Sequence, residues 1–370
     1  MSTRFKHHML KEIFEQPDAV LETLKAATSV DGSFFQQSWK DAGLEKLSRL
    51  VIAASGTSRH AGIAGEFMIE SLADIPVDVD YASEFQFSPV TVSPDVLTVV
   101  ITQSGETADT LAALRKAKKL GSKVVTISNV AGSSMMREAD FRIHTKAGPE
   151  VAVPSTKAFT AQLTALMLFA LFLAENRGDT SEKTVQALRA ELNVLPAKLQ
   201  ETLALDPQCE ALARRFAKCT DFIFAARGIH RAAALDGALK LKEVSYLHAE
   251  AFPTGEILHG PLATVDEDMT VVVIATVDHS DEVSRARYEK TLANLKELTA
   301  RSGKVIAVAV EGDQLVPVIV NDVIYVPKAP DLLLPILEIV PLQLFAYHMA
   351  VLLGRNVDNP RSLAKAVVND

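Results

Sequence analysis

Hydroxyl and amide side chains are crowded into one short loop of this 370-residue chain, formed by Thr102, Gln103, Ser104, Gly105 and Thr107. The loop follows an apolar run and precedes a helix-like pattern. Unpaired backbone N–H groups at the start of a helix carry partial positive charge, so a phosphate can bind there without any lysine. The hydroxyls would add donors, and the glycine would let the backbone approach closely. These residue types in this order are typical of an anion-binding loop.

A second loop of the same kind, Ser55-Gly-Thr-Ser58, follows the apolar run 49–55. Serine and threonine often do no more than cap a helix, and for a single loop we would favour that simpler interpretation. Two such loops at adjacent strand ends favour anion binding, because ligands of open α/β sheets collect outside the carboxyl ends of the strands. Neither loop has the Walker A or the G-x-G-x-x-G pattern, and we predict no cofactor.

Other positions carry groups that can do acid–base or covalent chemistry. Lys240 and Glu243 are three residues apart in a helical pattern, which places them on one face; on its own this predicts a solvated ion pair. His259 lies in a turn-rich segment and Lys365 in the C-terminal tail, where neither residue type by itself indicates a role. No histidines have the spacing of metal ligands, so we predict no catalytic metal.

Composition narrows the class of protein. The formal net charge is −8 and 48% of the residues are apolar, which is typical of a globular protein and argues against nucleic-acid binding. The two cysteines have no C-x-x-C partner, which favours a reducing, cytoplasmic setting. Polar residues interrupt the apolar stretches 158–174 and 332–354, and we expect buried core helices rather than membrane spans.

The elements that must position these groups are short β-branched runs separated by alanine- and leucine-rich helical patterns. Continuous apolar runs indicate strands of a parallel sheet that is covered on both faces. We therefore expect an α/β fold of doubly wound, mostly parallel sheets flanked by helices, in a three-layer, flavodoxin-like arrangement. The predicted strands are 49–55, 96–102, 123–128, 221–226, 269–276, 304–310 and 322–327.

The two halves of the chain resemble each other, which indicates a duplicated domain. Residues 50–70 and 222–243 share an apolar strand, small residues, a glycine, a basic residue or histidine, and an alanine-rich helix. Only the first copy keeps the hydroxyl-rich loop, because Thr-Val-Asp-His-Ser replaces it in the second. The predicted organisation is a helical lead-in (1–45), a first domain (46–180), a helical connection (181–215), a second domain (216–354) and a C-terminal tail (355–370).

Motifs spread along the chain resemble one known family. SGTS, TQSGETADTL, STKAFTAQL, ALKLKEVSYLHAEAF, GEILHGPLA and LAKAVVND are similar, in this order, to the sugar-isomerase half of the glutamine–fructose-6-phosphate aminotransferases, the glucosamine-6-phosphate synthases. The similarity runs from about residue 9 to the last residue. It implies two tandem sugar-isomerase (SIS) domains, usually in a homodimer.

The resemblance also implies the roles of individual residues. Glu243 would move a proton between C1 and C2 of the sugar, and Lys240 would support the charge. His259, from the partner subunit, would assist ring opening. Lys365 would form a Schiff base with the open-chain ketose, which acidifies the neighbouring C–H group. The residues implied to hold the sugar phosphate are Ser58, Thr102, Gln103, Ser104 and Thr107, with backbone contacts from Val153 and Ala364.

The chain also departs from the family pattern. Cys-Gly-Thr-Ser is Ser-Gly-Thr-Ser here, and Thr102 replaces the first serine of Ser-Gln-Ser; both changes keep a small polar group. The synthases carry a glutaminase domain whose nucleophile is an N-terminal cysteine, whereas Met1 is followed by Ser2 and the first cysteine is Cys209. We therefore expect no glutaminase activity in this chain; whether a separate source of ammonia or a glutaminase partner exists stays open.

Three functions stay open at this point. We favour aminotransferase-type isomerase chemistry between fructose 6-phosphate and glucosamine 6-phosphate. A stand-alone glucosamine-6-phosphate deaminase, or a 6-phosphofructosamine deglycase, would use nearly the same residues. A non-enzymatic sugar-phosphate sensor is disfavoured, because it would not need Glu243, His259 and Lys365 together and no helix-turn-helix segment is evident. The direction of the reaction and the gluco or galacto configuration of the sugar stay open.

Overall fold

The computed structural model describes residues 5–28, 46–89, 92–178, 180–302 and 304–368. Its internal contacts divide the chain into two compact units. Unit 1 comprises Met1–Phe14, Val151–Pro154 and Ala197–Leu363, and unit 2 comprises Glu15–Glu150, Ser155–Pro196 and Ala364–Asp370. Within the helical lead-in predicted over 1–45, residues 5–28 contain two helices, and residues 1–4 and 29–45 lie outside the described part.

Unit 2 is built on a sheet of five parallel strands in the order β2-β1-β3-β4-β5. The inner strands are almost wholly buried, because helices cover both faces of the sheet. The carboxyl ends of all five strands meet at one edge, as in other doubly wound sheets. The strands are β1 (Arg49–Ala54), β2 (Val77–Tyr81), β3 (Val96–Thr102), β4 (Lys123–Ser128) and β5 (Phe141–His144).

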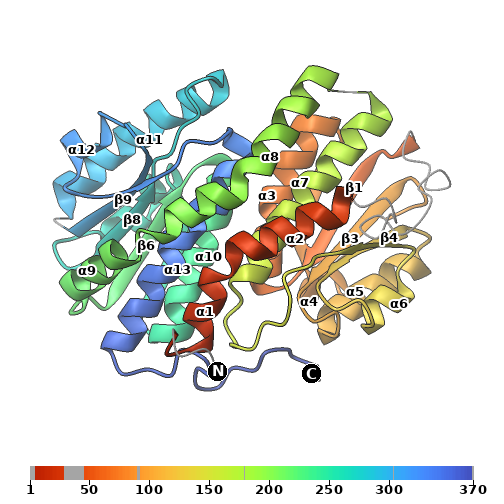
Figure 1. The fold of residues 1–370 in the computed structure, drawn as a ribbon, viewed down its shortest axis with the longest axis horizontal. Helices are drawn as coiled ribbons and strands as arrows, with labels where there is room; N and C mark the ends of the chain where they lie inside the picture. Colours follow the sequence, from red (N-terminus) through yellow and green to blue (C-terminus); the bar gives the residue numbers. More distant parts are fainter. Residues whose placement is uncertain (1–4, 29–45, 90–91, 179, 303, 369–370) are drawn as a thin grey trace. The chain divides into compact units, whose positions relative to one another are not determined.

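Helices α3 and α7 cover one face of this sheet, and α5 and α6 cover the other (Figure 1). The α3–α7 contact requires a glycine, since a Cβ at Gly65 would lie 2.8 Å from a methyl carbon of Leu166. The helices of unit 2 are α2 (Gln16–Thr28), α3 (Gly56–Ala73), α4 (Ala82–Phe85), α5 (Ala108–Lys119), α6 (Ser134–Glu138), α7 (Lys157–Arg177) and α8 (Glu182–Leu203), whose last residues belong to unit 1.

Unit 1 repeats the same sheet, with five parallel strands in the order β10-β9-β8-β6-β7. Helices α9, α10 and α13 pack together on one face, and α11 and α12 lie on the other (Figure 1). The strands are β6 (Asp221–Ala226), β7 (His248–Pro253), β8 (Thr270–Ile274), β9 (Lys304–Val310) and β10 (Asp322–Val326). The helices are α1 (His8–Phe14), α9 (Asp206–Phe216), η3 (Gly228–His230), α10 (Arg231–Ser245), η4 (Glu256–His259), η5 (Pro261–Thr264), α11 (Glu282–Arg301), α12 (Val316–Ile319), η6 (Asp331–Leu333) and α13 (Leu334–Leu352).

The predicted fold class is confirmed, because two parallel five-stranded sheets are each flanked by helices. Each predicted apolar run contains a strand, although the run 269–276 overestimates β8, which ends at Ile274. The sequence prediction missed β2, β5 and β7, which all lie at sheet edges. These three strands are partly exposed, so polar residues interrupt them and no continuous apolar run marks them, whereas the fourth edge strand, β10, is mostly apolar and was predicted.

The two long apolar stretches form helices of the predicted kind. By length and composition alone, Lys157–Arg177 and Asp331–Leu352 could each cross a membrane, but 89% of each apolar window is buried inside the structure. Polar residues within them are also buried, among them Gln162 and Glu338. Burial on all sides is what the prediction of core helices requires.

Candidate functional site

The hydroxyl-rich loop between β3 and α5 is held in shape by its own side chains. Thr102 Oγ1 accepts a hydrogen bond from the Gly105 N–H (3.1 Å) and lies 3.5 Å from Thr107 Oγ1. Ser104 Oγ accepts a bond from the Glu106 N–H (3.2 Å). Gly105 has a φ of +72°, which favours glycine. The loop therefore gathers three hydroxyls at the start of α5, as the sequence predicts.

Capping of helices, the simpler interpretation of these hydroxyls, is not seen at the two N-cap residues. Ser55 and Thr107 occupy the N-cap positions of α3 and α5, but neither side chain makes a capping hydrogen bond. Ser58, the third residue of α3, accepts a bond from Gln162 Nε2 of α7 (3.0 Å) and is nearly buried. These cap side chains leave the backbone N–H groups at the start of both helices to other acceptors; in α5, the N–H of Ala108 is accepted by Val367.

A buried hydroxyl beside the loop was not found from the sequence. Ser133 is 2% exposed, and its Oγ has no hydrogen-bond partner within the described part of the chain. A Cβ at Gly105 would lie 2.0 Å from this oxygen, so Ser133 packs directly on the loop backbone. Its only sequence signal was a position just before the short helix α6, which many serines share.

The C-terminal tail of unit 2 is docked on the same edge of the sheet as the loop. The carbonyl oxygen of Val367 accepts a hydrogen bond from the N–H of Ala108, the first residue of α5 (3.0 Å). Lys365 Nζ donates to Glu150 Oε2 (2.6 Å), in the segment that follows β5, and Ala364 is exposed. The structure therefore brings Lys365 and the hydroxyl-rich loop to one edge of one sheet.

In unit 1, α10 carries the predicted Lys240–Glu243 pair on one face. Lys240 Nζ lies 2.5 Å from Glu243 Oε2, and the lysine side chain is 1% exposed against 22% for the glutamate. A solvated pair would expose both partners. A buried ammonium is stable only when it is paired, so Glu243 is held by a charge that water does not screen.

The other two predicted residues of unit 1 are placed differently. His259 is exposed at the end of η4, before Gly260. Val153 donates its N–H to the carbonyl oxygen of Asp358 (2.8 Å), so a backbone contact from Val153 to a ligand would have to use its carbonyl group. Ser58, Gln103 and the rest of the predicted phosphate-binding side chains belong to unit 2.

The carboxyl edge of the second sheet carries a buried charge cluster that sequence reasoning missed. His230 occupies the position in the second copy that Ser58 occupies in the first. Its Nδ1 lies 2.6 Å from Glu338 Oε1 of α13, and its Nε2 lies 3.5 Å from Asp331 Oδ1. Arg287 of α11 forms an ion pair with Asp331. Paired charges therefore fill the place where the first copy has a hydroxyl and an amide.

This cluster raises the pKa of His230 and lowers the pKa of Asp331. Burial alone would lower the pKa of His230, but the adjacent Glu338 carboxylate outweighs it and raises that pKa above its usual value. Burial would likewise raise the pKa of Asp331, but hydrogen bonds from His230 and Arg287 hold it well below its usual range. The folded unit thus favours the protonated form of His230, which lies between two carboxylates.

We expect the pH dependence of stability to report this cluster. Since folding raises the pKa of His230, its contribution is complete below about pH 6.5, the unfolded value, and is lost as the pH rises through the folded value. The contribution of Asp331 is present above about pH 3.9 and is lost only as the pH falls below that value. Melting temperatures should therefore fall as the pH rises above about 6.5.

Replacing Glu338 with glutamine should remove that slope and destabilise unit 1 by about 3 kcal/mol, because one partner of a buried ion pair is lost. Thermal melts of both proteins across the pH range check this. Equal slopes in the two proteins would contradict the assignment to His230.

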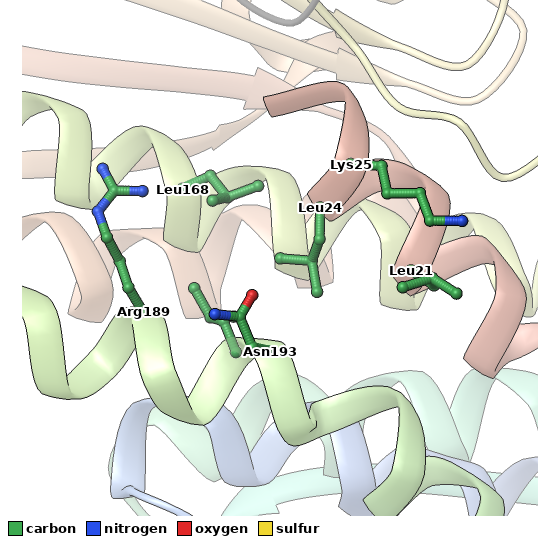
Figure 2. Close-up of a pocket in the computed structure, with 7 residues that line it drawn as sticks. Leu21, Leu24, Lys25, Leu168, Arg189 and Asn193 are labelled. Carbon is green, nitrogen blue, oxygen red and sulfur yellow. The ribbon is translucent and has the colours of Figure 1, made fainter. Parts of the chain in front are cut away.

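A cavity in unit 2 lies away from the predicted site residues. Its volume is about 180 Å³, and Figure 2 shows its lining from α2, α7 and α8: Leu21, Leu24, Lys25, Leu168, Arg189, Leu192 and Asn193. Lys25 is paired with Glu22 (2.7 Å) and Arg189 with Glu175 (2.8 Å), so both cations of the lining are already neutralised. None of the predicted site residues lines the cavity. We assign it no part in anion binding.

The SIS domain family model matches the chain twice, at residues 43–172 and 215–353. The glutamine–fructose-6-phosphate aminotransferase (isomerizing) of Chlorobaculum tepidum is 46% identical over 366 residues, which cover 98% of this chain and 58% of that protein. Its counterpart from Caldanaerobacter subterraneus is also 46% identical, over 98% of this chain and 59% of that protein. The chain thus spans somewhat more than half the length of these relatives.

Solved structures give a matching result. The C-terminal domain of glucosamine-fructose-6-phosphate aminotransferase from Francisella tularensis superposes with a TM-score of 0.89 at 39% identity, covering 97% of this chain and 99% of that one. A glucosamine-6-phosphate deaminase from Thermotoga maritima superposes with a TM-score of 0.72 at 23% identity, over 97% of this chain and 99% of that one. At that identity the second match shows the shared fold alone.

Proposed function

Because this chain belongs to the SIS domain family, we propose that it is a phosphosugar aldose–ketose isomerase and aminotransferase that interconverts fructose 6-phosphate and glucosamine 6-phosphate. The observation that carries the proposal is the edge of the unit 2 sheet. There the hydroxyl-rich loop can bind a phosphate, and Lys365 can react with a carbonyl group. The hydrogen bond from Ala108 to Val367 holds the tail that carries Lys365 against the helix that follows the loop. A phosphorylated sugar with a carbonyl group satisfies both.

In the proposed reaction, the loop hydroxyls and helix N-termini bind the phosphate, and Lys365 forms an imine with C2 of the open-chain ketose. Glu243 moves a proton between C1 and C2, and the buried ammonium of Lys240 holds that side chain in place. His259, exposed on its own subunit, assists ring opening in the partner subunit of a homodimer. Gln103, Val153 and Ala364 complete the contacts to the sugar phosphate.

A stand-alone deaminase is the second candidate. It would convert glucosamine 6-phosphate and water into fructose 6-phosphate and ammonia with the same residues, and a 6-phosphofructosamine deglycase is a variant of it. The 46% identity to aminotransferases favours the first candidate, since the Thermotoga maritima deaminase is only 23% identical. A sensor without catalysis would not need the buried Lys240–Glu243 pair.

The experiment that tests the proposal is incubation of the purified chain with glucosamine 6-phosphate and, separately, with fructose 6-phosphate, followed by assays of fructose 6-phosphate, glucose 6-phosphate and ammonia. Rapid release of both would identify a deaminase. Slow or no release, together with interconversion of fructose 6-phosphate and glucose 6-phosphate, is the result expected for the aminotransferase-type isomerase. No conversion of either sugar would contradict both enzymatic candidates.

The loop makes its own prediction. Ser104→Ala with Thr107→Ala should raise the KM for the sugar phosphate by about 100-fold or more, because each hydrogen bond to a charged group contributes roughly 1.5–3 kcal/mol. A matched control is Ser181→Ala with Thr184→Ala, an exposed hydroxyl pair 2.8 Å apart near the start of α8. Steady-state kinetics on both double variants measure the effect. An unchanged KM in the loop variant would refute the phosphate role.

A further inference from the structure

Glu150 is a buried carboxylate that contacts the nitrogen atom proposed to become covalent with the sugar. Its side chain is 0% exposed, and its Oε2 accepts a 2.6 Å bond from Lys365 Nζ. The two residues are 215 positions apart in the chain and belong to the same unit. A lysine on a C-terminal tail is thereby held at one point of the sheet edge.

The other oxygen of Glu150 fixes the carboxylate itself. Oε1 accepts hydrogen bonds from the N–H groups of Thr156 (2.9 Å) and Ala158 (3.1 Å), at the start of α7. A carboxylate at a helix N-terminus is stabilised by those N–H groups and by the helix dipole. Bonds to charged groups are also short and directional. Two backbone hydrogen bonds therefore fix the side chain of Glu150, and Lys365 takes its position from it.

An ammonium group cannot attack a carbonyl carbon, because its nitrogen has no lone pair. Lys365 must lose a proton before it can react, and Glu150 Oε2 is the acceptor already bonded to it. We propose that Glu150 is the positioning residue for Lys365 and takes up this proton. The inference deepens the proposed function and rests on its Schiff-base step.

The proton balance of that step closes without any further reactant. Glu150 Oε2 takes one proton from the ammonium, and the amine forms a C–N bond to C2 while the carbonyl π electrons move to oxygen. A second proton passes from nitrogen to that oxygen and gives a hydroxyl group. Glu150 then returns its proton to the hydroxyl, which leaves as water as the C=N⁺ bond forms. Three protons begin on nitrogen, and one ends on nitrogen and two in water.

If Glu150 only caps α7, its substitution should affect folding but not the reaction of Lys365, and a variant can distinguish this role from the proposed one. Glu150→Gln keeps a carbonyl oxygen that can accept the N–H groups of Thr156 and Ala158, but it removes the charge that holds Lys365 and accepts its proton. Glu22→Gln is the matched control, since it removes an exposed lysine partner elsewhere in the same unit. Melting temperatures report whether each variant folds.

The test is borohydride trapping of fructose 6-phosphate on the full chain, followed by mass spectrometry, together with the affinity for sorbitol 6-phosphate, which has the phosphate but no carbonyl. We expect Glu150→Gln to bind sorbitol 6-phosphate as the unmodified chain does and to trap the ketose at least 100-fold more slowly, the lower end of what proton transfer contributes. The control should match the unmodified chain in both assays.

Normal trapping by a folded Glu150→Gln protein would overturn this inference and leave the Schiff base intact. Absence of trapping in the unmodified chain would overturn the Schiff base and this inference together. If glutamine prevents folding, Glu150→Asp keeps the charge but withdraws the carboxylate by one methylene. That variant should trap the ketose more slowly at unchanged affinity for sorbitol 6-phosphate, and trapping at the normal rate would contradict the positioning role.

Discussion

Lys365→Met is expected to abolish borohydride trapping of fructose 6-phosphate and to reduce interconversion of the sugars to the background rate. Methionine fills a similar volume but has no amine, so no imine can form and the neighbouring C–H group is not acidified. Binding of the phosphate should persist, because the hydroxyls of Thr102, Ser104 and Thr107 come from a loop that is closed by its own hydrogen bonds.

The matched control is Lys118→Met, which removes a surface lysine of unit 2 that pairs with Asp140 at 3.3 Å. It should leave trapping and turnover unchanged. Persistent trapping in the Lys365→Met protein would refute the Schiff-base role, and loss of phosphate binding in it would show that the tail acts mainly in binding.

Glu243→Gln is the second substitution with a large expected effect. Positioned general bases contribute about 10²–10⁴ to rate, and an amide cannot take the proton that moves between C1 and C2. The kcat should fall by that factor at a similar KM, since the amide oxygen can still accept a bond from Lys240. Imine trapping at Lys365 should continue, because it precedes the proton shift.

The control for this prediction is Glu297→Gln, which removes the partner of Arg301 in an exposed ion pair on α11. Steady-state kinetics and trapping assays on both variants give the comparison. An unchanged kcat in Glu243→Gln would show that another group transfers the proton. A melting temperature lowered by many degrees would show that the pairing of Glu243 with Lys240 is mainly structural.

The parts of the fold that the sequence predicted share one physical cause. Strands buried on both faces must be apolar along their whole length, so β3, β4, β6 and β9 were found at their observed bounds. The edge strands β2, β5 and β7 are only partly covered, and polar residues hide them in the sequence.

Some contacts of the candidate site could be predicted from the sequence and others could not. Contacts between residues close in sequence were predictable, among them the hydroxyl loop and the face shared by Lys240 and Glu243. The burial of Lys240 and the contact between Lys365 and Glu150 were not, because they depend on tertiary packing that no spacing rule reports. Only the family resemblance indicated a role for Lys365, because a lysine in a C-terminal tail does not by itself indicate one.

The duplication adds a contrast between the two sheets. Both carry a polar contact at the same place, between the turn after the first strand and a long buried helix. In unit 2 it joins Ser58 and Gln162, which are neutral, and in unit 1 it joins His230 and Glu338, which are charged. Uncharged donors suit a phosphate, whereas the charged groups of the unit 1 cluster are bonded to one another. The contrast favours unit 2 as the proposed phosphate-binding unit.

The most direct test of the central claim is proton exchange on the sugar itself. The purified chain is incubated with fructose 6-phosphate in D₂O, and deuterium at C1 and the appearance of glucose 6-phosphate are followed by NMR. The account predicts that deuterium enters C1 and that glucose 6-phosphate forms, with both signals lost in Glu243→Gln. A chain that binds the sugar phosphate but exchanges no proton and forms no aldose would contradict it.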